Sequence, residues 1–249
     1  MGEGEVRFGI AYFGVRDLDH AAADLAGMRR EGFDWVLLPM TQDDAACERR
    51  TFEALVGLAV AEDLLPVISL WGGGEFGGEG IAGPLSAADW LEVARDTGAG
   101  VLHVDEPKNR SLSVPQLLDL WGDDATAWLT VEPHRADRFD AETYRRPAVV
   151  GTDAYDGPLA ERVAATEGFR AATGRLDLAW VQAFRIPAGA EADVGAEMRA
   201  MAALAPRVGI WGWRGSTGRG DLRSARPLAV QDAVAAAIAE VRAGAAGDR

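Results

Sequence analysis

The chain has 249 residues, of which 48% are hydrophobic and 26% are charged, and its 39 acidic and 25 basic residues give a formal net charge of -14. This composition is that of a globular protein with a full core, and it excludes a disordered chain. The negative field repels phosphate backbones and anionic lipids, so we expect neither a nucleic acid nor a membrane as a partner.

Two further features of the sequence concern its environment. The single cysteine, Cys47, excludes an intrachain disulfide and a cysteine-rich metal site. The N-terminus has neither the basic start nor the long apolar run of a secretion signal, and no uncharged apolar stretch reaches the roughly 18 residues of a membrane span. We therefore expect a cytoplasmic protein.

Eight short β-rich runs alternate along the chain with longer segments of helical period. The predicted strands cover residues 6–15, 33–40, 65–70, 100–104, 127–131, 148–152, 179–184 and 207–213. The predicted helices cover residues 17–31, 50–62, 86–97, 114–120, 159–173, 191–204 and 228–243, whereas residues 135–146 have little apolar periodicity and are expected to be mostly loop. This alternation predicts an α/β fold, a (β/α)8 TIM barrel that forms a single domain over residues 1–249.

Two adjacent carboxylates, Asp105 and Glu106, follow the fourth predicted strand. In barrels of this kind the reacting groups come from strand ends and from the loops after them. Desolvation raises the pKa of a carboxyl group and a neighbouring like charge raises it further, so one member of the pair is a candidate general acid near neutral pH. The alternative for the pair is a helix cap or a loop salt bridge with Lys108 or Arg110.

Further acids follow the next two predicted strands. Glu132 comes after the fifth strand, and Asp153 comes after the sixth, with Tyr155 two residues later. An Asp-Gly turn is the alternative reading of the segment after the sixth strand, and it explains Asp153 poorly. His103 should lie within the fourth strand, where the role of a core histidine with satisfied hydrogen bonds is expected.

Aromatic and amide side chains stand at three other strand ends. Trp71 follows the third predicted strand, Gln182 lies in the seventh, and Trp211 lies in the eighth. Flat indole faces bind the apolar side of a sugar ring, whereas Gln, Asp and Tyr side chains bind its hydroxyl groups, so the mixture favours a carbohydrate ligand. For any single tryptophan the alternative is ordinary filling of the barrel interior.

These strand ends resemble those of the cellulase-like glycoside hydrolase barrels related to clan A, in particular a subgroup with Asp-Glu-Pro after the fourth strand. The matching stretches are 104–107, 153–155 and 181–184, followed by 191–204 and 210–213, while the first half matches as a generic barrel apart from the glycine-rich loop at 71–78. The resemblance implies that Glu106 protonates the departing sugar oxygen. Clan A proper has Asn-Glu after the fourth strand and a nucleophilic Glu at the end of the seventh, whereas this chain has Asp105 and offers Gln182 or Phe184 there.

From these residues we expect a glycoside hydrolase-like enzyme that cleaves a glycosidic bond in a small carbohydrate or glycoconjugate and requires no cofactor or metal. Asp153 is the predicted base or nucleophile, and Glu132 is the carboxylate that would replace it. In a second mechanism, which resembles that of hexosaminidase-type barrels, Asp105 orients an acetamido group of the substrate. Asp105, Tyr155, Gln182, Trp71, Trp211 and Glu132 are the predicted substrate-binding residues. The oligomeric state is left open.

Three other classes remain open at this stage. A divalent-metal isomerase or lyase would draw its ligands from the histidine and acids already named, although no His-x-His spacing marks a metal site. A phosphate-binding barrel is suggested by the glycine-rich stretch 212–220, which follows the eighth predicted strand. A non-catalytic carbohydrate-binding barrel would keep the tryptophans and release no product.

Overall fold

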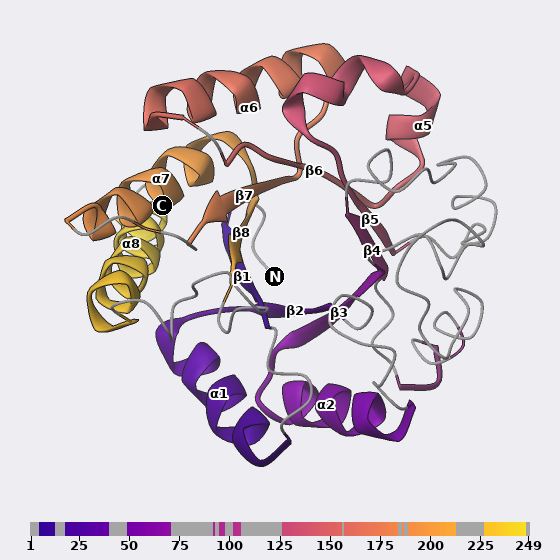
Figure 1. The fold of residues 1–249 in the computed structure, drawn as a ribbon, viewed down its shortest axis with the longest axis vertical. Helices are drawn as coiled ribbons and strands as arrows, with labels where there is room; N and C mark the ends of the chain where they lie inside the picture. Colours follow the sequence, from indigo (N-terminus) through magenta and orange to yellow (C-terminus); the bar gives the residue numbers. More distant parts are fainter. Residues whose placement is uncertain are drawn as a thin grey trace.

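The computed structural model describes residues 5–12, 18–39, 49–70, 92, 95–97, 102–105, 126–155, 157–183, 186, 189–212 and 227–247. Eight parallel strands pair in sequence order, and the eighth pairs with the first, so that the sheet closes into a barrel. Figure 1 shows the helices as a ring outside the strands. The predicted (β/α)8 barrel is confirmed, while the assignment of all 249 residues to one domain stays a prediction.

The strands and helices lie close to their predicted positions. The strands are β1 (Arg7–Ala11), β2 (Trp35–Pro39), β3 (Leu65–Leu70), β4 (Leu102–Asp105), β5 (Ala127–Thr130), β6 (Val149–Asp153), β7 (Leu178–Gln182) and β8 (Arg207–Trp211). The helices are α1 (Leu18–Glu31), α2 (Arg49–Ala61), α5 (Ala141–Arg145), α6 (Leu159–Thr173), α7 (Glu191–Leu204) and α8 (Pro227–Gly247). None of these described helices is both long and apolar enough to cross a bilayer.

The segment after β5 differs from its prediction as mostly loop. It forms the short 3-10 helix η3 (Pro133–Arg138) and then α5. Local hydrogen bonds stabilise these elements: Thr143 N donates to the side chain of Asp140 at 2.7 Å, and the Tyr144 hydroxyl donates to the carbonyl of Ala136 at 3.0 Å. Local hydrogen bonds therefore define this segment, and such bonds leave no apolar period in the sequence. The predicted helix over 114–120 lies outside the described residues.

Side chains alternate along the strands between the outside and the inside of the barrel. On the outside an apolar cluster packs between strands and helices, and on the inside a second apolar cluster draws on β1 to β3 and β5 to β8. The inner cluster contains four indole rings, those of Trp35, Trp128, Trp180 and Trp211. Trp35 lies edge-on to Trp128 and to Trp180, with ring centroids 5.1 and 5.5 Å apart. The barrel interior is thus a packed core and not a channel.

Glycines in two strands make room for these rings. A Cβ atom placed on Gly9 would lie 1.8 Å from the ring of Trp35, and one placed on Gly209 would lie 2.5 Å from the ring of Trp180. Both distances are far below van der Waals contact, so the indoles occupy the space that a side chain on β1 or β8 would need.

We expect Gly209→Ala to lower the free energy of unfolding by about 1–3 kcal/mol, because the added methyl group must displace Trp180 or the backbone of β8. Urea unfolding followed by tryptophan fluorescence measures the effect. Gly57→Ala is the matched control, since Gly57 is exposed in α2 and a Cβ atom there meets nothing within 4 Å. A gain of up to about 1 kcal/mol is expected from the control. Equal effects of the two substitutions would contradict this account of the interior.

Candidate active site

Three acids stand where β4, β5 and β6 reach the carboxyl-terminal rim of the barrel. Asp105 ends β4, Asp153 ends β6, and Glu132 comes two residues after the end of β5. Each follows an inward position of its strand by two residues, so the alternation of side chains turns all three toward the barrel mouth. Their exposed fractions are only 7% for Asp105, 8% for Glu132 and 7% for Asp153.

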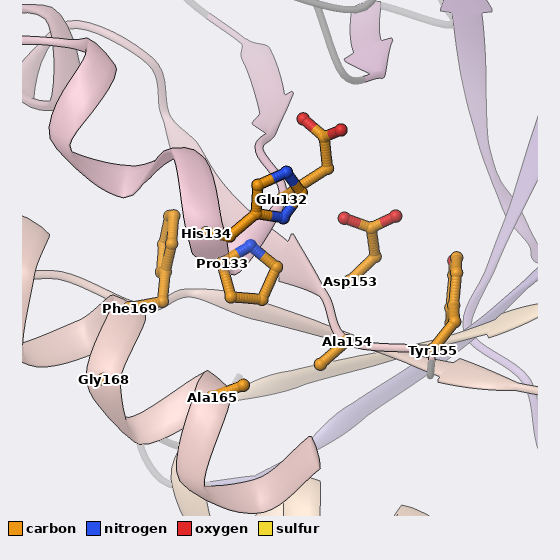
Figure 2. Close-up of a pocket in the computed structure, with 9 residues that line it drawn as sticks. All are labelled: Glu132, Pro133, His134, Asp153, Ala154, Tyr155, Ala165, Gly168 and Phe169. Atoms are coloured by element: carbon orange, nitrogen blue, oxygen red, sulfur yellow. The ribbon is translucent and has the colours of Figure 1, made fainter. Parts of the chain in front are cut away.

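Glu132 and Asp153 line a cavity of about 560 Å³ at this rim. The other lining residues come from the segments after β5 and β6 and from α6: Pro133, His134, Ala154, Tyr155, Ala165, Gly168 and Phe169. Figure 2 shows the carboxyl groups of Glu132 and Asp153 turned to the same side, with the ring of Tyr155 beyond Asp153. The cavity thus presents two carboxyl groups together with apolar and aromatic surface.

Arg135 links two polar side chains of this cavity. Its Nε lies 3.3 Å from Oε1 of Glu132 and donates a hydrogen bond to Nε2 of His134 at 3.2 Å. The guanidinium therefore partly balances the charge of Glu132. Because Nε2 of His134 accepts a hydrogen bond, the proton of the neutral ring belongs on Nδ1.

The other predicted site residues lie in different places. Trp211 is 5% exposed and packs edge-on against Trp180 in the inner cluster, with ring centroids 5.4 Å apart. Gln182 lines a second cavity of about 250 Å³ between the end of β7 and the beginnings of α6 and α7. Neither of these two residues, nor Asp105, is among the described residues that line the larger cavity. Glu106 and Trp71 lie outside the described residues.

The predicted site therefore comes together in part: Glu132, Asp153 and Tyr155 share one cavity. Sequence reasoning gave no binding role to His134 and did not find Phe169. A histidine after a strand-end acid was a usable signal for the first. Phe169 offered none, because an apolar residue at helical spacing reads as core, and its ring does pack edge-on against Tyr144 of α5.

Cation binding at the rim is limited by geometry. Within the described ranges, no three His, Cys, Asp or Glu side chains are grouped so that they could hold a metal ion. In the described part of the rim, a cation would thus find at most two His, Cys, Asp or Glu side chains close enough to bind it together.

His103 is a core residue, as the sequence predicts. It is fully buried, and its Nδ1 and Nε2 share hydrogen bonds with Ser69 Oγ at 3.0 Å and Thr130 Oγ1 at 2.8 Å. Nε1 of Trp180 donates to the same Thr130 oxygen at 2.9 Å. Burial lowers the pKa of His103 to about 3, so the ring is neutral in the folded protein.

The comparisons with known proteins identify a fold and not a family. No protein-family model matches the chain, and no curated protein sequence matches it. A GH5_18 protein from Streptomyces cattleya, solved in complex with GlcNAc, shares 16% identity and a TM-score of 0.59, over 96% of this chain and 80% of that one.

Two other solved structures of this fold belong to proteins of other kinds. Thiamine phosphate pyrophosphorylase from Pyrococcus furiosus shares 11% identity and a TM-score of 0.55, over 96% of each chain. D-psicose 3-epimerase from Clostridium cellulolyticum, solved with D-tagatose, shares 11% identity and a TM-score of 0.53, over 96% of this chain and 99% of that one. These likenesses support the barrel fold alone, since one barrel hosts unrelated chemistries.

The buried His103 should make stability depend on pH in a defined direction. The unfolded chain binds a proton at this ring below pH 6.5, whereas the folded chain binds it only near pH 3. The stability that depends on the neutral ring is complete above pH 6.5 and is lost as the pH falls through that window.

His103→Gln removes this proton uptake. In urea unfolding at a series of pH values, the slope of unfolding free energy against pH between about 6 and 4 should fall by up to about 1.4 kcal/mol per pH unit. His20→Gln, which removes an exposed imidazole from α1, is the matched control. Equal slopes in the two variants would contradict the neutral buried state of His103.

Proposed function

We propose that this chain is a glycoside hydrolase-like enzyme that cleaves a glycosidic bond by carboxylate chemistry at the carboxyl-terminal rim of the barrel. One observation carries the proposal: Glu132 and Asp153, both buried, line one cavity of about 560 Å³ together with Tyr155. Glycosidic cleavage needs two carboxyl groups on either side of the scissile bond, one to protonate the leaving oxygen and one to attack the sugar or activate water.

Glu132 and Asp153 come from neighbouring places on the rim, after β5 and at the end of β6. Oε1 of Glu132 lies 3.3 Å from Nε of Arg135, so the two side chains form an ion pair. Asp153 projects from the last position of β6, and we assign it the role of base or nucleophile. The general acid is Glu106, by the resemblance of 104–107 to the Asp-Glu-Pro barrels, and Glu132 is the carboxylate that replaces Asp153 if the substrate lies nearer β5.

A sugar fits the lining of the cavity. Carboxylates and the Tyr155 hydroxyl bind hydroxyl groups, while Pro133 and Ala154 offer apolar surface to the face of a pyranose. The GlcNAc complex of the GH5_18 protein and the D-tagatose complex of the epimerase add support by analogy. Both proteins share this barrel fold, at 16% and 11% identity, and both were solved with a bound carbohydrate.

A screen of aryl glycosides and oligosaccharides tests the proposal. The parent protein should release product from at least one of them, and Asp153→Asn and Glu106→Gln should each lower kcat by about 10²–10⁴, as loss of an acid or base does. Asp137→Asn is the matched control, since Asp137 is an exposed acid of η3 close to the cavity, and it should keep the parent activity.

Each other outcome has a definite meaning. Full activity in Glu106→Gln removes Glu106 from the mechanism, and full activity in both variants overturns the proposal. Sugar binding by calorimetry without product from any glycoside identifies a non-catalytic carbohydrate-binding barrel instead.

A further inference from the structure

A buried ion pair joins α6 and α7 next to the connection between β6 and α6. Nε and Nη2 of Arg162 donate to Oε1 and Oε2 of Glu197 at 3.0 and 2.8 Å, a two-pronged pairing of guanidinium and carboxylate. The Glu197 side chain is 1% exposed and the Arg162 side chain 14%. Both line the smaller cavity of about 250 Å³.

The same guanidinium has a third contact, which is not needed to join the helices. Nη1 of Arg162 donates a hydrogen bond to the carbonyl oxygen of Gly157. Gly157 belongs to the short connection between Asp153, the last residue of β6, and Leu159, the first of α6. Glu197 thus fixes Arg162, and Arg162 fixes the backbone of the connection that carries Tyr155.

The backbone at Gly157 accepts few alternatives. Its φ is 91°, in the left-handed region that favours glycine, so any other residue there would be strained. At the other end of the connection Tyr155 packs against the inner cluster of the barrel. The connection is therefore fixed at both ends, by the barrel interior at Tyr155 and by Arg162 at Gly157.

We propose that Arg162 and Glu197 are positioning residues of the active site, which hold the β6–α6 connection so that Asp153 and Tyr155 keep their places in the cavity. Their importance for catalysis rests on the proposed function, whereas the effect on the connection does not depend on it. Neither residue touches the larger cavity, so both act through the Gly157 carbonyl.

The electrostatics of the pair suit this role. Burial raises the pKa of Glu197 to about 6, and the hydrogen bonds and charge of Arg162 oppose that rise, so the carboxylate is ionised at neutral pH. Buried ion pairs often stabilise a fold no better than apolar residues of similar volume, because desolvation offsets their attraction. A role in placing the Gly157 carbonyl gives this pair a function that an apolar pair would lack.

That difference defines the experiment. Arg162→Met combined with Glu197→Met replaces the pair by apolar side chains of similar length, and Met has no N–H group for the Gly157 carbonyl. Amide hydrogen exchange over residues 153–161, measured on the whole chain at neutral pH without substrate, should rise at least about tenfold. The midpoint of urea unfolding should stay close to that of the parent.

Arg199→Gln is the matched control. Arg199 pairs with Glu240 at 3.0 Å and so joins α7 to α8 at an exposed position, away from the β6–α6 connection. Its loss should leave exchange over 153–161 unchanged. Parent-like exchange over this segment in the double variant would overturn the proposal and make the pair a packing element only.

A second variant keeps the test decisive if the double variant fails to fold. Arg162→Lys retains the charge beside Glu197 but cannot reach both carboxylate oxygens and the Gly157 carbonyl at once. Exchange over 153–161 should again rise, and parent-like exchange would again overturn the proposal. If the glycoside screen finds an activity, the variants with faster amide exchange over 153–161 should also have a lower kcat. If exchange rises in the variants but the parent protein has no glycosidase activity, the role of Arg162 in holding Gly157 is supported, and only the proposed reaction is contradicted.

Discussion

The filling of the barrel interior by indole rings is the constraint on which the rest of the structure depends. Trp35 and Trp180 fit because Gly9 and Gly209 leave their strands bare at the facing positions. Fixing these rings inside fixes which residues of each strand face inward. On β5 the side chains of Trp128 and Thr130 face the barrel interior, and Glu132 continues the same alternation. The packing of Trp128 in the core therefore determines that Glu132 lies on the inner side of the rim.

A polar network lies between part of this apolar core and the rim. Ser69, His103, Thr130 and Trp180, from four strands, share one hydrogen-bonded network. It lies directly beneath the acids, since Asp105 and Glu132 follow His103 and Thr130 by two residues on the same strands. A satisfied buried network of this kind specifies one arrangement of its strands, which gives the acids above it defined positions.

The fold was predictable because β-rich runs and segments of helical apolar period alternate along the sequence. The bounds of α6 and α7 agree with the prediction, and every predicted strand overlaps an observed one. The strand-end acids were predictable for the same reason, since alternation tells whether a side chain faces the barrel interior. Alternation does not tell depth, so it does not distinguish a tryptophan that lines a sugar site from one that packs edge-on in the inner cluster, as Trp211 does against Trp180. The pairing of Arg162 with Glu197 is a tertiary contact between residues 35 positions apart, so no local sequence pattern predicts it.

The larger cavity is bounded by the segments after β5 and β6, and both of them contact α6. The segment after β5 packs against α6 through η3, and the connection after β6 is held at Gly157 by Arg162 of α6. Arg162, Ala165 and Phe169 lie three and four residues apart, so they occupy one face of α6. That face anchors the connection at its beginning and forms the cavity wall further along. A shift of α6 on the barrel would therefore move the wall and Tyr155 together, so the docking of this helix sets the shape of the site as a whole.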